Sequence, residues 1–312
     1  MSNKIELSIV SPVYAAPNLI SELCKRIHTS VSTITNDYEI VLVFDCSPDD
    51  GWNRIIEESK KDKRVKGIKL SRNFGQHKAI VAGINQCLGK QVVVMDCDLQ
   101  DMPEEIPALY KKMQEGYDIV KCRRVDRKDS FLKKLMSKCF YKLFNFLSGI
   151  KADYSVANYG IYSRKVIDTI KLLKEEAQYF PLSVIWSGFN STAIDVKHNK
   201  RSSGKSGYTL FKMIQLASDI IVSYSAKPLY VSIFFGGIIS FVTILISVIY
   251  FILSLMGHFK VSGFATIIIS IWFLSGTLLF FFGIIGLYIA KIFDNVKQRP
   301  IYIIDKKVNI DE

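Results

Sequence analysis

Residues 91–101 read QVVVMDCDLQD, a short apolar run that is followed by three acids. A run of β-branched residues bounded by polar turn residues is typical of a buried strand. Helical patterns precede it at 76–88 and follow it at 103–115, so the strand is expected to lie between two helices. The stretch therefore predicts a strand–helix repeat, with Asp96 and Asp98 directly after the strand.

The same alternation covers the first 121 residues of the chain. Strand–helix alternation predicts an α/β fold with a mostly parallel sheet between layers of helices. No GxGxxG pattern follows the first strand, which argues against an ordinary dinucleotide-binding fold. The expected strands are 7–11, 39–44, 65–70, 91–95 and 118–121, and the expected helices are 18–34, 52–60, 76–88 and 103–115.

Polar and charged residues follow each of the five expected strands. Ligands of parallel sheets bind beyond the carboxyl ends of the strands. Any one of these residues would most often be an ordinary solvated loop residue, but five successive sets at the ligand-binding edge are harder to explain by chance. We therefore expect a site there, built from Pro12–Tyr14, Asp45, Arg72–Gly75, Asp96–Asp101 and Arg123–Arg124.

Asp96 and Asp98 are one residue apart, a spacing at which two carboxylates in a turn can face one cation. Mg²⁺ or Mn²⁺ is commonly held by one or two carboxylates, and substrate phosphates complete the shell. Such an ion neutralises charge on a diphosphate leaving group. The pair predicts a metal–diphosphate site, although Asp-x-Asp alone is a common pattern. Asp45 is a candidate to hold the base or ribose of a nucleotide.

Two long stretches without charge, 229–257 and 261–290, occupy the last third of the chain. About 20 apolar residues span a bilayer, so we expect two membrane helices, at about 229–256 and 263–290. The short link makes them a hairpin. Basic residues flank its outer ends and only Lys260 lies in the link, which places the flanking parts in the cytoplasm. The first residues show no signal-peptide pattern, in keeping with a cytoplasmic N-terminal part.

Two basic amphipathic stretches, about 130–149 and 207–227, are suited to helices that lie in the headgroup layer. For the first, a surface helix docked on the core is an equally good interpretation. The expected organisation is a cytoplasmic domain over 1–228 that includes both interface helices, two spans over 229–293, and a cytoplasmic tail over 294–312.

The formal net charge of +12 favours a membrane partner over nucleic acid. No nucleic-acid reader motif is present, so no nucleic-acid partner is expected. Lysines and arginines instead crowd the segments beside the spans, where each gains about 1 kcal/mol from anionic lipid. The six cysteines contain no CxxC pair, which argues against a zinc site.

An ordered set of motifs resembles family 2 glycosyltransferases of the GT-A fold. The chain is most similar to the polyprenyl-phosphate branch, which includes dolichol-phosphate mannose synthases, bactoprenol glucosyltransferases and the undecaprenyl-phosphate formamido-arabinose transferase. The resemblance covers essentially the whole chain, and it is the order of the motifs that is specific. The motifs are 9–14 (IVSPVY), 45–49 (DCSPD), 70–77 (LSRNFGQH), 96–106 (DCDLQDMPEEI), 186–189 (WSGF), 201–208 (RSSGKSGY) and 227–229 (KPL).

The resemblance implies roles at the matching positions. Asp96 and Asp98 would hold Mg²⁺ or Mn²⁺, with Asp98 the stronger ligand. Arg123, Lys133 and Ser137 would bind the acceptor phosphate. The implied nucleotide-sugar ligands are Pro12, Tyr14, Asp45, Arg72, Asp96, Gln100, Arg201 and Lys205.

The implied catalytic residues are Asp98, Arg123 and Asp153. Asp153 is the candidate for the position often described as the base, although an ungapped alignment puts Asn158 there. A phosphate monoester has a second pKa of about 6, so a lipid phosphate is largely ionised at neutral pH. Any base is therefore expected to act mainly by positioning. A further departure is 15–18 (AAPN), where the family usually has Asn-Glu after the tyrosine.

The implied activity is inverting transfer of a sugar from a nucleotide diphosphate-sugar, taken as UDP-linked, to undecaprenyl phosphate. It would take place at the cytoplasmic face of the inner membrane, in a multi-pass protein that supplies cell-envelope glycan such as lipopolysaccharide or O-antigen. Two alternatives stay open: direct transfer to a glycan or glycolipid, and a non-catalytic scaffold or translocation partner. Small-residue patches at 236–237 and 283–286 permit a homo-oligomer.

Overall fold

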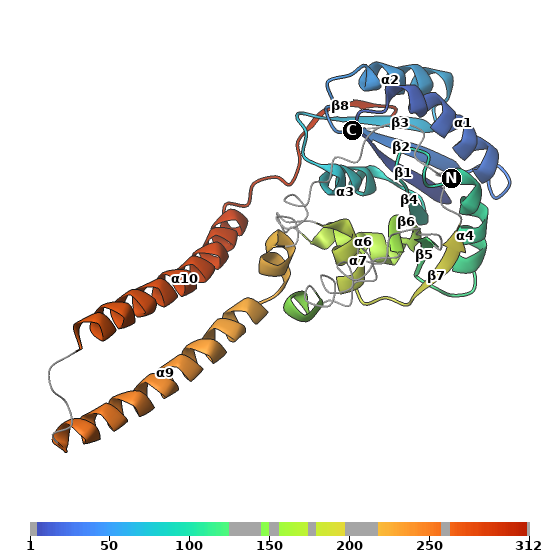
Figure 1. Cartoon of the computed structure of the whole chain (residues 1–312). Helices are drawn as coiled ribbons and strands as arrows, with labels where there is room; N and C mark the ends of the chain where they lie inside the picture. Colours follow the sequence, from blue (N-terminus) through green and yellow to red (C-terminus); the bar gives the residue numbers. More distant parts are fainter. Residues whose placement is uncertain are drawn as a thin grey trace. The chain divides into compact units, whose positions relative to one another are not determined.

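The computed structural model describes residues 5–124, 145–149, 156–173, 179–196, 218–256 and 263–310 (Figure 1). The chain forms two compact units. One comprises 1–136, 152–207 and 299–312, and the other comprises 137–151 and 208–298. The first unit holds the sheet and the second holds the two longest helices.

The predicted α/β fold with a mostly parallel sheet is confirmed. Eight strands have the order β7-β5-β6-β4-β1-β2-β3-β8. The pairs β4–β1, β1–β2, β2–β3 and β5–β7 are parallel, whereas β6 is antiparallel to β4 and β5, and β8 to β3. The strands are β1 Leu7–Val13, β2 Tyr38–Phe44, β3 Val65–Leu70, β4 Gln91–Val94, β5 Ile119–Arg124, β6 Val156–Ser163, β7 Ser191–Val196 and β8 Ile304–Val308.

Helices cover both faces of this sheet, and for this reason every residue of β1 and β2 is buried. Successive side chains of a strand point to opposite faces. In β2, Ile40, Leu42 and Phe44 join one apolar cluster, and Val41 and Val43 join the other. The helices of this unit are α1 Ile20–Val31, α2 Gly51–Lys61, α3 Gln76–Gln86, α4 Ile106–Met113, α6 Arg164–Leu172 and α7 Phe180–Trp186, with short 3₁₀ turns η1 Pro17–Leu19 and η2 Pro103–Glu105.

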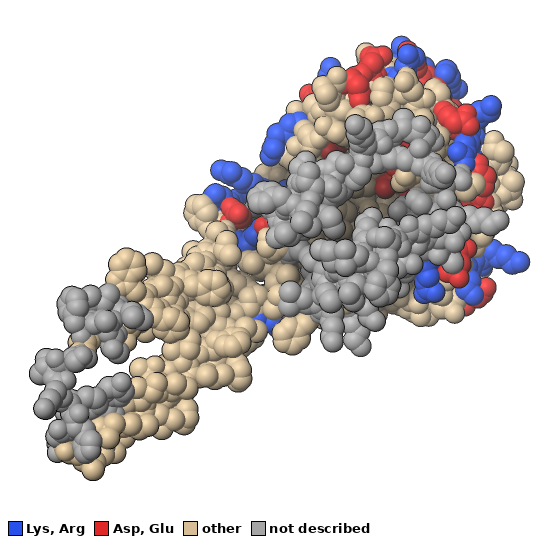
Figure 2. Space-filling model, in the orientation of Figure 1, with Lys and Arg blue, Asp and Glu red and all other residues tan. Residues whose placement is uncertain are grey.

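The second unit contains the two predicted apolar helices, α9 Lys227–Leu255 and α10 Phe264–Val296. Both are long and apolar enough to cross a membrane, and the qualifying segments, 227–246 and 270–296, are not buried as the core helices of a soluble domain are. Figure 2 shows them almost without charged side chains. Within this unit the Tyr288 hydroxyl donates to Ser225 O at 2.6 Å.

The predicted interface helices fall largely outside the described residues. Of 207–227 the structure describes the last part, where 218–224 is helical. Of 130–149 it describes 145–149, of which 145–148 is helical. Here Lys227 Nζ donates to Phe146 O at 2.8 Å, so the start of α9 is tied to this short helix.

The stretch 294–312, predicted as a tail, contains a strand that sequence reasoning did not identify. It begins with the last turn of α10, and β8 then pairs with β3 from Gly67↔Val308 to Leu70↔Ile304. β8 has five residues, three of them charged, so its sequence alone is a weak strand signal. Its partner lies more than 200 residues away in the sequence, and local patterns contain no information about such a pairing.

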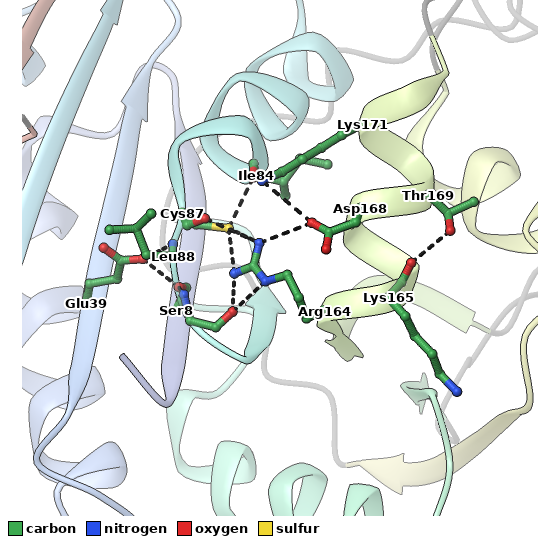
Figure 3. Close-up of polar contacts among 11 residues, drawn as sticks. Ser8, Glu39, Ile84, Cys87, Leu88, Arg164, Lys165, Asp168, Thr169 and Lys171 are labelled. Carbon is green, nitrogen blue, oxygen red and sulfur yellow. Dashed lines mark hydrogen bonds and ion pairs between the residues drawn. The ribbon is translucent and has the colours of Figure 1, made fainter. Parts of the chain in front are cut away.

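Arg164 fixes the end of α3 at the amino-terminal edge of the sheet (Figure 3). Its Nε donates to Gly89 O at 2.8 Å and its Nη1 to Cys87 O at 3.3 Å. Cys87 and Gly89 lie in the connection between α3 and β4, so the guanidinium holds the segment that directly follows the helix. From the other side, Leu88 N donates to Glu39 Oε1 at 2.6 Å. Because α3 is held at this end, the position of its first turn at the opposite edge is also determined.

Replacing Arg164 with methionine is expected to lower the free energy of unfolding by about 2–3 kcal/mol, because hydrogen bonds from a charged donor are worth about 1.5–3 kcal/mol. Lys165→Met is the matched control. Lys165 pairs with Asp118 at 2.6 Å, but its side chain is 59% exposed. The Asp118 side chain is only 14% exposed, but the solvent-exposed ammonium of Lys165 is screened, so we expect a loss of about 1 kcal/mol. Denaturant unfolding of the two purified variants measures the difference, and equal losses would contradict the role of Arg164.

Candidate active site

The loops after β1, β2, β3 and β4 meet at the carboxyl edge of the sheet, as predicted. Each contains a residue with positive φ: Ala15 (52°), Cys46 (52°), Gly75 (93°) and Leu99 (59°). Left-handed backbone costs a non-glycine residue about 1–2 kcal/mol and persists where the surroundings determine it. Sharp turns at four neighbouring strand ends bring polar groups of separate loops together at this edge.

Asp45 joins the loops after β2 and β3. Its side chain is 2% exposed. One carboxylate oxygen accepts the N–H of Phe74 at 2.8 Å, and the other accepts the N–H of Gly75 at 2.9 Å. Burial raises the pKa of Asp45, and the two backbone donors act in the opposite direction. The Asp45 backbone N–H also donates to Val13 O at 3.0 Å, which links the loop to β1.

Gln76, the first residue of α3, carries this network to the acids after β4. Its Nε2 donates to Asp96 Oδ1 at 2.6 Å. Because Gln76 directly follows Gly75, the contact connects the Asp45 loop with Asp96. Gln76 belongs to the 70–77 sequence motif, but the sequence alone did not indicate a role for it. Its position directly after the predicted loop was the one available signal.

The turn after β4 is held together by its own side chains. Gln100 N donates to Asp98 Oδ1 at 3.1 Å, and Asp96 N donates to Asp101 Oδ2 at 3.3 Å. Asp101 is 4% exposed. Cys97, between the two aspartates, is buried, and burial raises the pKa of its thiol to about 12. A thiol with this pKa is not a nucleophile at neutral pH.

Two contacts from other elements, β6 and α1, hold the segment that follows this turn. The Tyr159 hydroxyl, in β6, donates to Met102 O at 2.7 Å, and the Tyr159 side chain is 1% exposed. Arg26 of α1 binds both carboxylate oxygens of Glu104, with distances of 2.8 and 2.6 Å. Sequence reasoning assigned no role to these residues, because their contacts join segments far apart in the chain.

The described residues contain no group of three or more His, Cys, Asp or Glu side chains that could hold a metal by themselves. Asp96 and Asp98 offer hard oxygen donors in one turn. Mg²⁺ and Mn²⁺ sites are commonly built from one or two carboxylates together with substrate phosphates. The donor set therefore fits a cation that binds together with a diphosphate.

Arg123 lies at the same edge, two strands away from the Asp96 turn. Since β6 is antiparallel to both β4 and β5, β5 runs in the direction of β4 and ends at the same edge. Arg123 Nη1 lies 3.8 Å from Asp195 Oδ1, and both side chains are largely exposed. Asn158 lies near the start of β6, two residues before the partner of Val94, and so belongs to this edge as well.

The other residues predicted to bind the nucleotide-sugar differ in how far they are exposed to solvent. Pro12 is buried within β1, Tyr14 is 51% exposed, and Arg72 is exposed, with its guanidinium 4.3 Å from the centre of the Phe74 ring. Gln100 is half-buried in the turn described above. Five predicted site residues lie outside the described residues: Lys133, Ser137, Asp153, Arg201 and Lys205.

His77 packs beside this edge, in the first turn of α3. Its ring centre lies 4.1 Å from that of Tyr179. Its Nδ1 is inaccessible to solvent and has no hydrogen-bond partner within the described part of the chain. Burial lowers the pKa of the imidazole to about 4, so His77 is neutral at physiological pH.

The low pKa of His77 predicts a stability that depends on pH. The unfolded chain binds this proton near pH 6.5 and the folded chain near pH 4. Between these two pH values the unfolded state binds more protons than the folded state, so the free energy of unfolding decreases as the pH falls. Between pH 7 and pH 5 we expect the free energy of unfolding to fall by about 2 kcal/mol. In His77→Phe this fall should be absent. Unfolding of both proteins against pH measures this, and parallel profiles would refute it.

Comparison with known proteins relates this architecture to one family. A model of "Glycosyl transferase family 2" matches residues 8–171. The chain is 36% identical to the uncharacterized glycosyltransferase YkcC of Bacillus subtilis (strain 168), over 100% of this chain and 97% of that protein. It is 32% identical to the undecaprenyl-phosphate 4-deoxy-4-formamido-L-arabinose transferase of Proteus mirabilis (strain HI4320), over 98% and 94%.

Among solved structures, the chain is similar to glucosyl-3-phosphoglycerate synthase from Mycobacterium tuberculosis, crystallised with Mn²⁺, uridine diphosphate and phosphoglyceric acid. The TM-score is 0.47 at 14% identity, and the match covers 70% of this chain and 76% of that one.

Proposed function

The chain belongs to glycosyl transferase family 2, and from this premise we propose that it transfers a sugar from a nucleotide diphosphate-sugar to a polyprenyl phosphate. The observation that carries the choice of acceptor is the combination, in one chain, of a family 2 domain with two helices long and apolar enough to cross a membrane. The relative from Proteus mirabilis, which is named for undecaprenyl phosphate, supports the same choice over nearly the full length.

On the donor side, Asp45, Arg72 and Gln100 would bind the nucleotide-sugar together with Pro12 and Tyr14. The 51% exposure of Tyr14 suits stacking on a base. Arg201 and Lys205 would add positive charge near the diphosphate. UDP is the proposed carrier.

Asp96 and Asp98 would hold Mg²⁺ or Mn²⁺, which when bound neutralises charge on the leaving diphosphate. The contacts from Gln76 and Gln100 orient these carboxylates before the ligand arrives. Orientation in advance is a large part of electrostatic catalysis, because no reorganisation is needed during the reaction.

On the acceptor side, Arg123 would bind the lipid phosphate with Lys133 and Ser137. The phosphate oxygen forms a bond to the anomeric carbon while the bond from that carbon to the nucleoside diphosphate breaks, with inversion. With a second pKa of about 6 the acceptor needs little proton removal. The residue at the base position, Asp153 or Asn158, would therefore position the acceptor rather than deprotonate it.

The proposed location is the cytoplasmic face of the inner membrane, with both α9 and α10 spanning it and the sheet domain in the cytoplasm. The basic residues flanking the two spans support this orientation. The lipid-linked sugar would then be used for a cell-surface glycan, such as a lipopolysaccharide or O-antigen modification. Self-association through the small residues of α9 and α10 is compatible with this arrangement.

The test is to incubate membranes that contain the full chain with labelled nucleotide-sugars and undecaprenyl phosphate. Organic-extractable label that depends on the added lipid is the expected result. Label that appears only in a water-soluble or glycan fraction would replace the proposal with direct transfer to a glycan. No transfer from any of the UDP-, GDP-, dTDP- and CDP-sugars, under conditions where the chain is folded, would favour a scaffold.

A further inference from the structure

The C-terminal segment 299–310 pairs with β3 and continues past its end. The antiparallel register of β3 and β8 runs to Leu70↔Ile304. One residue further along, Ser71 N donates to Ile303 O at 2.9 Å. Ser71 begins the 71–75 loop, the same loop that carries Arg72 and the two N–H groups bound by Asp45. The tail therefore holds the start of a loop of the candidate active site.

The residue before Ile303 also contacts α3, in the last turn of that helix. Tyr302 OH accepts a hydrogen bond from Asn85 Nδ2 of α3 at 2.8 Å. Tyr302, Ile304 and Phe74 pack against the same apolar cluster, on the α3 face of the sheet. The tail thus contacts the start of the loop through Ser71, and the helix that follows the loop through Asn85.

The opposite end of the tail is anchored separately. Asn309 Nδ2 donates to Ser59 O at 2.7 Å and to Val65 O at 2.9 Å. These partners lie at the end of α2 and at the start of β3, which is the amino-terminal edge of the sheet. Two anchors of one segment thus lie at opposite ends of β3, and only one of them adjoins the candidate site.

We propose that residues 302–304 are positioning residues for the donor site, acting through the 71–75 loop on Asp45 and through α3 on Asp96. This inference rests on the proposed function, because it assigns the loop to nucleotide binding. Without β8, β3 would be an edge strand with unpaired backbone groups. Phe74 and Gly75 would keep their bonds to Asp45, but the start of their loop would lose the bond from Ser71 N to Ile303 O.

Tyr302→Ala and Asn309→Ala test the proposal as a matched pair, since each removes one anchor of the same segment. Tyr302→Ala is expected to raise KM for the nucleotide-sugar about tenfold, with KM for the lipid phosphate unchanged. Asn309→Ala is expected to lower stability and leave both KM values unchanged. Tyr302→Phe, which keeps the ring, should fall between wild type and Tyr302→Ala. Equal effects of the two alanine variants on donor KM would overturn the proposal and leave only a structural role.

A chain that ends at Gln298 keeps both apolar helices and lacks the tail. We expect it to bind nucleoside diphosphate at least about tenfold more weakly, and a peptide of residues 299–312 to restore binding by strand addition. Titration of the protein with UDP, GDP, dTDP or CDP in the presence of Mn²⁺ measures nucleotide binding without any acceptor. A protein that binds nucleotide but does not transfer sugar to lipid would therefore contradict only the proposed acceptor. Unchanged nucleotide binding in the truncated chain, or in Tyr302→Ala if the truncated chain does not fold, would overturn the inference.

Discussion

Asp98→Ala is expected to lower sugar transfer by about 10³-fold or more while leaving the fold and membrane association intact. Removing a single preorganised group that stabilises transition-state charge costs about 10²–10³ in rate, and Asp98 is also a proposed ligand of the cation. Asp98 Oδ1 accepts the N–H of Gln100 within its own turn at 3.1 Å. Transfer is measured as organic-extractable label, and folding by thermal unfolding.

The matched control for Asp98→Ala is Glu57→Ala, which removes an acid that is 52% exposed on α2. It should transfer at the wild-type rate, since exposed pairs contribute little. Excess EDTA should reproduce the Asp98→Ala loss in the wild-type protein, and Mg²⁺ or Mn²⁺ should reverse it. Full activity of the variant, or of the wild type in EDTA, would eliminate the metal role assigned to the Asp96–Asp98 pair.

Asp45→Ala is expected to lower kcat/KM for the donor by about 100-fold and to destabilise the protein by about 2–4 kcal/mol. The stability loss follows because the N–H groups of Phe74 and Gly75 would lose their acceptor, and an unsatisfied buried donor costs about 1–3 kcal/mol. The activity loss follows because the 71–75 loop and the base or ribose contact depend on the same carboxylate. Steady-state kinetics and denaturant unfolding measure the two effects.

Asp50→Ala is the control for Asp45→Ala, because Asp50 lies in the same loop after β2 with 57% of its side chain exposed. It should change neither quantity appreciably. Asp45→Asn should be intermediate, since an amide can accept one of the two N–H groups but not both. A wild-type donor KM in Asp45→Ala, despite lower stability, would mean that Asp45 only supports the fold.

Local sequence patterns predicted the centre of the sheet well. The apolar runs at 39–44, 65–70 and 91–95 correspond closely to β2, β3 and β4. β2 and β4 are buried along almost their whole length and are mostly apolar, so their signal is strong, whereas β3 keeps a weaker signal because Lys66 and Lys69 are only partly buried. The same reasoning placed Asp45 and Asp96 at the carboxyl edge, because parallel neighbours end on the same side.

Other elements were not predictable from local patterns. β8 and β6 owe their place in the sheet to partners distant in sequence, and β8 has three charged residues among five. Gln76 and Tyr159 are ordinary polar residues in the sequence, and only their contacts make them part of the site. Lys133, Ser137, Asp153, Arg201 and Lys205 stay predictions, because they lie outside the described residues.

By itself, the sequence determined the α/β class, the two apolar helices and the set of acids after the strands. Periodicity and apolar length are local properties, which follow from how each segment meets water or lipid. The tertiary structure decided which polar groups meet: Asp45 with the 71–75 loop, Gln76 with Asp96, and the C-terminal segment with Ser71 and Asn85. The physical reason is that hydrogen bonds between loops depend on the register of strands and the direction of helices. Both are set by packing across the whole sheet.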